Sequence, residues 1–489
     1  MDSKREIETL IRSKYPILYV VSYEERRVEL ALQGIATTLS RTLHTWSLTQ
    51  GMKPVLGSGA KSTLSPELEA LAQVYEAPDG TIVMLRDFHH YMRDPRVLRL
   101  LRDIAGRLRE KKTSLILTGS PMELHPDIEK DVSLLNFPLP DGEEIGRLLD
   151  TAHASLPEEI RSKIEMTPEN RERIAKSAQG LTINEVEAVL ARSIVESKTF
   201  DPAVIQKEKE QVVRKSGVLQ YFQPDASLAD VGGMSILKDW LNQRTGNFTD
   251  AAREFGIPAP KGILMLGVQG CGKSLTAKAI ASLWNLPMLR LDVGSIFGQY
   301  VGQSEMQMRK ALATAEAISP CILWVDELEK AFAGTRNSGD SGASSRVFAT
   351  FLTWMQEKKS PVFIVATGND VSALPPELLR KGRFDEIFFI DLPEQKERED
   401  IFRIHIGKRK RDPKKFKLKV LAEASEGFNG AEIETCVVAA LQRAFFQKRE
   451  LTQADLSAEV EACVPLSVMM AEDISALRDW ASMRARSAG

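Results

Sequence analysis

The chain has 489 residues, 43% hydrophobic and 27% charged, a composition typical of globular proteins and a length that predicts about three domains. Its 65 Lys and Arg nearly cancel its 67 Asp and Glu, so no overall field attracts it to nucleic acid or to a membrane surface. The charged N-terminus does not resemble a signal peptide, no stretch approaches the ~20 apolar residues that span a bilayer, and the 4 scattered cysteines form no disulfide framework. We therefore expect a cytoplasmic protein with free thiols and no membrane insertion.

The first 200 residues predict an α/β domain whose elements return later in the chain. Four segments, 81–90, 114–121, 137–149 and 178–190, each have a counterpart 240 to 253 residues further on. A nearly constant offset is typical of a repeat with small insertions, and chance similarity between two α/β regions is the alternative. We interpret residues 1–200 as a diverged copy of the region from 226 onward, joined to it by a polar, helical linker at 201–225.

A glycine-rich loop lies beyond the linker, between a buried strand predicted at 262–267 (GILMLG) and a helix predicted at 273–284 (KSLTAKAIASLW). The loop reads GVQGCGKS and fits GxxxxGK[ST] through Gly267, Gly270, Gly272, Lys273 and Ser274. Glycines let successive backbone N–H groups approach phosphate oxygens without Cβ clashes, and the helix N-terminus adds partial positive charge. Lys273 is suited to reach the β- and γ-phosphates, and the Ser274 hydroxyl to bind Mg²⁺. The loop therefore predicts a site for a nucleoside triphosphate.

Two carboxylates, Asp326 and Glu327, end the next strongly apolar strand, which reads CILWVDELEK at 321–330. An isolated Asp-Glu pair after a strand is often only a solvated turn. Beside a phosphate-binding loop, however, Asp326 is suited to hold Mg²⁺ through its water shell, and Glu327 to orient and deprotonate the attacking water. We therefore predict Asp326 as a metal ligand together with Ser274, and Glu327 as the catalytic base.

A further buried strand, PVFIVATGND at 361–370, ends in Asn369, whose amide is suited to bind the attacking water and the γ-phosphate. Arg380 and Arg383 come next in the stretch LLRKGRFD. Planar guanidinium groups stabilise the charge on a transferring phosphoryl group and can be supplied by a neighbouring subunit, although two surface arginines are the alternative. We predict Asn369, Arg380 and Arg383 as catalytic residues.

Together these residues resemble the motifs of the AAA+ ATPases, and within them those of the AAA clade. The pair at 326–327 matches Walker B, the asparagine matches sensor 1, and the two arginines match arginine fingers. DVGG at 230–233 is similar to the segment whose backbone contacts adenine, and FNGAEIE at 428–434 is similar to the lid-helix motif. YVGQSE at 300–305 is similar to a pore loop, with Tyr300 and Val301 as its aromatic and aliphatic residues. The resemblance covers about 226–489, with its motifs in family order.

This resemblance implies a fold, cofactors and a set of site residues. We expect an α/β P-loop module at 226–395, with a parallel five-stranded sheet flanked by helices, and a helical lid at 396–489. The implied cofactors are ATP and Mg²⁺. The implied nucleotide-binding residues are Asp230, Gly232, Gly267, Gly270, Cys271, Gly272, Lys273, Ser274, Leu275, Gly430 and Ala431.

The chain departs from the clade's pattern at a few positions. The loop carries Val268, Gln269 and Cys271 where the clade usually has prolines and threonine, one glycine precedes Asn369, and RKGR replaces RPGR. Cys271 makes the loop a candidate for oxidation, but a small residue that fills space is the simpler interpretation. The spacing from the asparagine to the arginines is intact, so their predicted roles stand.

The first 200 residues lack this chemistry. Residues 15–27 stand where the glycine loop belongs and contain neither glycine nor lysine. Phe88 follows Asp87 in place of a second carboxylate, and Ser120 replaces the asparagine. We therefore expect a degenerate ATPase-like domain that binds no nucleotide and serves as a scaffold or in recognition.

A degenerate half fused to one intact module resembles an AAA family of cyanobacteria and algal plastids, linked to photosynthetic regulation and named for a hypothetical chloroplast reading frame. The resemblance implies an ATPase of the bacterial cytoplasm or plastid stroma that remodels or unfolds a protein client as a homo-oligomeric ring, expected to be a hexamer. A nucleotide-switched scaffold that threads no client is the alternative. The basic segment 407–419 has no interleaved aromatic residues, so we favour a solvated lid surface over nucleic-acid binding there.

Overall fold

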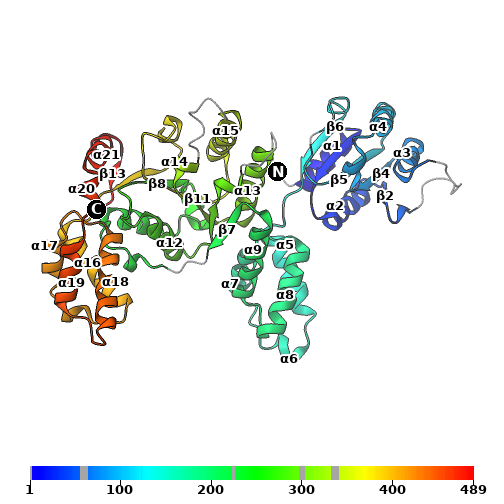
Figure 1. Ribbon diagram of the computed structural model, residues 1–489. Coiled ribbons are helices and arrows are strands. Elements are labelled where there is room, and N and C mark those ends of the chain that lie inside the picture. The colour runs from blue at the N-terminus through cyan, green and yellow to red at the C-terminus, as the bar shows by residue number, and fades with distance from the viewer. Residues whose placement is uncertain are drawn as a thin grey trace. The chain divides into compact units, whose positions relative to one another are not determined.

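A computed structural model of the chain describes residues 3–54, 64–122, 124–222, 226–296, 303–331, 341–380 and 382–489. The chain divides into two compact units, Met1–Ile205 and Gln206–Gly489. Each unit contains a sheet flanked by helices and a separate helical bundle (Figure 1). Within these described ranges, no helix is long and apolar enough to cross a membrane.

The first unit has a six-stranded sheet in the order β3-β2-β4-β5-β1-β6, in which the neighbours are parallel except for the antiparallel pair β2 and β3. The strands are β1 (Ile17–Val21), β2 (Thr42–Ser47), β3 (Gly51–Lys53), β4 (Thr81–Arg86), β5 (Ser114–Gly119) and β6 (Val132–Asn136). The helices beside the sheet are α1 (Ser3–Arg12), α2 (Glu25–Thr38), α3 (Pro66–Glu76) and α4 (Pro95–Leu108). The bundle contains α5 (Gly142–Ala154), α6 (Glu158–Arg161), α7 (Pro168–Ala178) and α8 (Ile183–Ser197), and α9 (Pro202–Ser216) comes after it.

The second unit has a seven-stranded sheet in the order β13-β12-β8-β11-β10-β9-β7. Its strands are β7 (Leu219–Phe222), β8 (Gly262–Gly267), β9 (Met288–Leu291), β10 (Cys321–Val325), β11 (Val362–Gly368), β12 (Glu386–Ile390) and β13 (Arg486–Ser487). The predicted five parallel strands, β12-β8-β11-β10-β9, form the centre. The sequence did not reveal the two edge strands, the antiparallel β7 and the short parallel β13.

Side chains of alternate residues on the central strands point to opposite faces of this sheet. Ile263 and Met265 belong to the core on one face, whereas Leu264 and Leu266 belong to the core on the other. Because helices cover both faces of the sheet, strand β8 is apolar along its whole length. The helices of this part are α10 (Ser235–Asn242), α11 (Asp250–Glu254), α12 (Lys273–Trp284), α13 (Gln303–Ile318), α14 (Leu328–Ala331) and α15 (Ser341–Glu357).

The lid has its own hydrophobic core, built by α16 (Gln395–Lys408), α17 (Leu418–Ala424), α18 (Gly430–Phe446) and α19 (Gln453–Ala462). After α20 (Leu466–Met469), helix α21 (Ala471–Arg484) leaves this bundle and returns to the sheet (Figure 1). Ile474 is buried in the core on one face of the sheet, and Arg478 pairs with Asp391 at 2.8 Å. The chain after the lid therefore packs against the ATPase-like sheet.

The two units repeat one fold. The order β6-β1-β5-β4-β2 corresponds to β12-β8-β11-β10-β9. Each sheet adds an antiparallel edge strand beyond these five, but β3 follows β2 in the chain whereas β7 precedes β8. Helices α8 and α18 both begin with a capping box, at Thr182 and Asn429. Asp87 after β4 and Glu327 after β10 share a left-handed backbone, with φ of 51° and 49°. Asp87 therefore corresponds to Glu327, one position away from the expected pairing of Phe88 with Glu327. The repeat predicted from the sequence is confirmed, with this correction to its register.

Candidate active site

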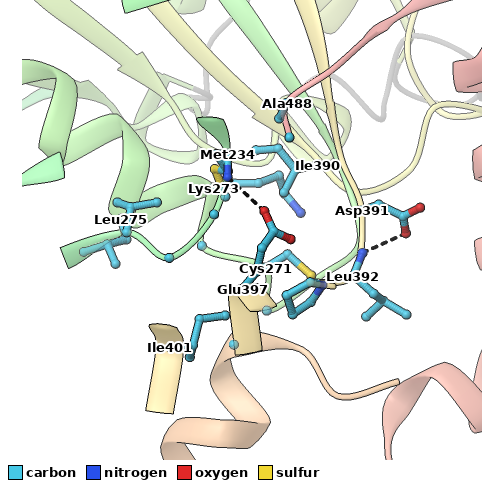
Figure 2. Close-up of a pocket in the computed structure, with 18 of the residues that line it drawn as sticks. Met234, Cys271, Lys273, Leu275, Ile390, Asp391, Leu392, Glu397, Ile401 and Ala488 are labelled. Atoms are coloured by element: carbon cyan, nitrogen blue, oxygen red, sulfur yellow. Dashed lines mark hydrogen bonds between the residues drawn. The ribbon is translucent and has the colours of Figure 1, made fainter. Parts of the chain in front are cut away.

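A cavity of about 1050 Å³ lies in the second unit, where the phosphate-binding loop, the ends of β10, β11 and β12, and the lid helices α16 and α18 meet (Figure 2). Most of the predicted site residues line it. These are Asp230, Gly232, Gly270, Cys271, Gly272, Lys273, Ser274, Leu275, Asp326, Glu327, Asn369, Gly430 and Ala431. Segments far apart in the sequence thus meet at one place, as the motif order predicted.

Two glycines of the loop lie where a side chain would collide with its surroundings. At Gly267 (φ 151°), a Cβ would come within 1.9 Å of the Ile390 carbonyl oxygen on the neighbouring strand. At Gly270 (φ 81°), a Cβ would lie 2.7 Å from the Asn429 side chain at the start of the lid helix α18. The Ala431 N–H also donates to the Gly270 carbonyl at 3.1 Å. The loop therefore packs closely against both the sheet and the lid. This close packing explains why glycine stands at these two positions, although glycine loses more backbone entropy on folding than any other residue.

Lys273 is the first residue of α12 and is 7% exposed. Its Nζ donates to the carbonyl oxygens of Gly267 and Val268, both at 2.8 Å. Burial lowers the pKa of this ammonium to about 8. The cation is therefore held inside the loop by backbone oxygens, and its charge is lost as the pH rises through about 8.

Asp326 and Ser274 present their oxygens on one wall of the cavity. The Ser274 hydroxyl donates to Asp326 Oδ1 at 3.3 Å, and Arg290 lies 3.7 Å from Oδ2 of the same carboxylate. A hydroxyl beside a carboxylate is the oxygen donor set that Mg²⁺ prefers. The residues present therefore fit the magnesium ion that the sequence implied.

Glu327 lines the same cavity from the turn after β10. A left-handed backbone is uncommon for a residue other than glycine and costs of order 1–3 kcal/mol, so neighbours must hold it. The Glu327 N–H donates to the Thr367 hydroxyl at 3.1 Å, and the Glu327 carboxylate pairs with Lys330 at 2.9 Å. The conformation of the predicted base is thus fixed from β11 and from α14.

Asn369, which comes directly after β11, is held through its backbone by a buried carboxylate. Its N–H donates to Glu329 Oε1 at 3.1 Å, and Glu329 is 5% exposed. The second oxygen, Oε2, finds no hydrogen-bond partner among the described residues, and burial raises the pKa of this carboxyl group. The sequence missed both Glu329 and Thr367, because which strand ends become neighbours is visible only in the folded sheet.

The two predicted arginines lie away from the cavity. Arg380 is exposed, whereas Arg383 is 8% exposed and donates to the Glu377 carbonyl. Neither lines the cavity of its own chain. The predicted pore-loop residues Tyr300 and Val301 lie outside the described residues.

Segment 230–234 and the lid helix α16 also line the cavity. The Asp230 carboxylate pairs with Lys408 of α16 at 3.0 Å and accepts the Ser227 N–H at 2.8 Å. The Ser227 N–H and Lys408 lower the pKa of Asp230. The carboxylate of Asp230 therefore links this segment to the lid helix α16.

Residues 487–489 form a wall of the cavity that no sequence pattern indicated. The Ala488 N–H donates to the Phe389 carbonyl, and its own carbonyl accepts the Leu237 N–H, both at 3.0 Å. Beside them, Glu397 of the lid accepts the Met234 N–H at 3.2 Å (Figure 2). This wall depends on the return of α21 to the sheet, and no local sequence pattern in residues 487–489 predicts that return.

The corresponding place in the first unit is filled by protein groups. Three residues separate β1 from α2, where five separate β8 from α12. Glu24, which is 7% exposed, accepts the Ile183 N–H at the start of α8 at 2.6 Å and pairs with Arg27 at 2.8 Å. Arg27 also pairs with Glu144 at 2.5 Å and lies over the Phe137 ring. A carboxylate and a guanidinium thus join the sheet to the bundle where the second unit has its cavity.

The motifs and the fold place the chain in a class of proteins. Residues 263–392 match the model of the ATPase family associated with various cellular activities (AAA). Residues 3–137 and 143–216 match the models of the N-terminal and second domains of SpoVK-like AAA ATPases. The chain therefore belongs to the AAA ATPase family.

Full-length relatives narrow the class. The chain is 39% identical to an uncharacterized AAA domain-containing protein ycf46 of Guillardia theta, over 99% of this chain and 95% of the relative. It is 36% identical to the ycf46 protein of Pyropia yezoensis, over 100% of this chain and 99% of the relative. A cell division cycle protein 48 homolog of Archaeoglobus fulgidus is 32% identical over 43% of this chain and 29% of the relative. The family indicated by the resemblance in sequence is confirmed.

Proposed function

We propose that the second unit binds ATP with Mg²⁺ and hydrolyses it. The observation that carries this proposal is the meeting of Lys273, Ser274, Asp326, Glu327 and Asn369 around one cavity. These are the groups that phosphoryl transfer to water requires: a cation for the phosphates, oxygen ligands for the metal ion, a base and a polar amide. Mg²⁺, when bound, neutralises charge on the β- and γ-phosphates.

Each residue has a distinct role in this proposal. Lys273 exchanges its two carbonyl partners for phosphate oxygens, and Ser274 and Asp326 hold the metal ion directly or through water. Glu327 takes the proton of the attacking water, which Asn369 orients toward the γ-phosphate. The nucleotide lies between the segment 230–234 and the lid, with Gly232, Gly430, Ala431, Cys271 and Leu275 along its length.

Of the two arginines expected from the sequence to be catalytic, only Arg380 acts, in this proposal, on the site of a neighbouring subunit. Arg380 is exposed and does not line its own cavity, so it is suited to reach a cavity on another copy of the chain. Arg383 is buried against Glu377, so its role in this proposal is to shape the loop that presents Arg380. A site completed in this way favours a closed homo-oligomeric ring, which we propose to be a hexamer.

The ring is proposed to remodel or unfold a protein client in the bacterial cytoplasm or plastid stroma, with a role in the regulation of photosynthesis. The competing function is a scaffold whose assembly is switched by ATP. A Tyr300→Ala variant separates the two, because a motor that grips its client through this residue should lose client unfolding while it keeps its ATPase rate. The test compares ATP turnover with the unfolding of a client recovered on the ATP-bound chain. An unchanged rate of client unfolding would favour the scaffold.

A further inference from the structure

Thr367 is a buried residue of β11, two positions before Asn369, and it is 2% exposed. Its hydroxyl donates to Asp326 Oδ1 at 2.6 Å and accepts the N–H of Glu327 at 3.1 Å. The hydroxyl uses its single donor and one of its two acceptor lone pairs on two consecutive residues at the end of the neighbouring strand. One side chain therefore ties the predicted metal ligand Asp326 and the predicted base Glu327 to β11.

The two contacts act on different properties of the site. The bond to Oδ1 restricts the rotation of the Asp326 carboxylate, whose Oδ1 also accepts the Ser274 hydroxyl at 3.3 Å and whose Oδ2 lies 3.7 Å from Arg290. The bond from the Glu327 N–H stabilises the left-handed turn that aims the Glu327 side chain into the cavity. Because Asn369 lies just beyond the same strand, Thr367 sets the spacing between the metal ligand, the base and the amide.

Thr367 also lines the cavity. We propose that it is a positioning residue for ATP hydrolysis, whose hydroxyl holds Asp326 and Glu327 in their working geometry. This inference rests on the proposed function of the site. A misplacement of about 1 Å in a catalytic group costs as much as 10²-fold in rate, so the loss of both hydrogen bonds should appear in turnover more than in binding.

The chain contains a natural comparison at Thr118 of the first unit. Thr118 is paired with Arg86, the counterpart of Asp326, and it is fully buried. There the Thr118 hydroxyl donates to the carbonyl of Leu85, a residue of the neighbouring strand β4, at 3.5 Å. A threonine at this register position is therefore compatible with a purely local role, and Thr118→Val is a matched control for the loss of a buried hydroxyl at a strand end.

The test uses the full chain with Thr367→Val, Thr367→Ser and Thr118→Val. Valine keeps the shape of threonine and removes both hydrogen bonds, whereas serine keeps the hydroxyl. For each variant, the ATP dissociation constant, kcat and the melting temperature are measured at saturating Mg²⁺. We expect kcat of Thr367→Val to fall at least ~10-fold, with ATP affinity within about threefold of the wild-type value. Thr367→Ser should retain most of the turnover, and Thr118→Val should match the wild type.

The results that would overturn the proposal for Thr367 differ from the result that would refute the proposed function of the site. Wild-type turnover in Thr367→Val would show that the hydroxyl positions nothing of catalytic importance. Equal losses in the valine and serine variants, or a loss of ATP affinity that parallels the loss of kcat, would assign Thr367 a packing role. A wild-type chain that binds ATP and never hydrolyses it would instead refute the proposed function.

Discussion

At the scale of single residues, hydrogen bonds from neighbouring groups hold the key side chains of the site in place. Lys273 is held by two carbonyl oxygens of its own loop, and Glu327 is held in a left-handed turn. Asn369 is anchored by the buried Glu329. For Glu327 and Asn369, such pre-organisation reduces the rearrangement needed on binding, which is how enzymes gain rate from electrostatic groups, whereas Lys273 exchanges its carbonyl partners for phosphate oxygens in the proposed function.

The lowered pKa of Lys273 predicts that ATP affinity depends on pH. Below pH 8 the ammonium is charged with or without ATP, so affinity is constant. Above about 8 the free protein loses this proton, and a bound triphosphate must restore it. We therefore expect affinity to fall as pH rises from about 8 toward 10, by up to tenfold per pH unit, in calorimetric titrations at fixed ionic strength.

The control for this pH dependence is Lys238→Met. Lys238 also lines the cavity, its pKa is also lowered by burial, and its Nζ donates to the Val231 carbonyl at 2.6 Å. The fall in ATP affinity above pH 8 should persist in the Lys238→Met variant. Affinity that stays flat from pH 7 to pH 9.5 in the wild type would contradict the assignment to Lys273.

How far the sequence predicted the site depended on whether each contact was local. The loop residues from Gly267 to Ser274 were predictable because their spacing and the flanking strand and helix contain the whole signal. Thr367 and Glu329 were not, because their partners are set by which strands become neighbours. The wall at 487–489 depends on packing between segments distant in sequence.

At the scale of elements, the two units share a fold but differ in one connection, which is β8 to α12 in the second unit and β1 to α2 in the first. In the second unit, a five-residue glycine loop leaves a cavity between sheet and lid. In the first unit, the connection is shorter, and Glu24 and Arg27 bind the sheet to the N-terminus of α8 and to Glu144. The negative carboxylate of Glu24 lies at a helix N-terminus, a position that also attracts phosphate groups.

The Glu24–Arg27 pair predicts a stability effect confined to the first unit. Arg27→Leu leaves the buried carboxylate without its guanidinium, a change that costs about 3–5 kcal/mol for a buried pair. The exposed Arg26→Leu should change stability by less than ~0.5 kcal/mol. Differential scanning calorimetry of the full chain should show this shift in one transition. If Arg27→Leu and Arg26→Leu change the stability equally, the Glu24–Arg27 pair does not stabilise the first unit.

The filled site in the first unit also predicts the binding stoichiometry. Titration of the full chain should give one ATP per chain, because the cavity of the second unit alone carries a phosphate-binding loop. Lys273→Ala should abolish detectable binding while the protein stays folded. Unchanged ATP affinity in folded Lys273→Ala would remove the assignment of the loop, whereas two ATP per wild-type chain would contradict the degenerate interpretation of residues 1–200.

At the scale of the whole molecule, the separation of the arginines from the cavity predicts that activity depends on contact between subunits. Arg380→Ala should bind ATP and lose hydrolysis by about 10³-fold, the size of effect seen when an arginine finger is lost. Mixing Arg380→Ala with Lys273→Ala should restore part of the activity, because one chain supplies the loop and the other the arginine. Specific activity of the wild type should rise with protein concentration. Full turnover by an isolated monomer would rule out the ring.

The most direct test of the account is the pair of measurements on Glu327→Gln, ATP affinity and ATP turnover. Glutamine keeps the size of the side chain and removes its basicity, so the cavity and the loop that hold ATP remain intact. We predict ATP affinity close to that of the wild type, with hydrolysis slower by at least ~10²-fold, as the loss of a positioned general base implies. Wild-type turnover in this variant would contradict the account, because another group would then activate the water.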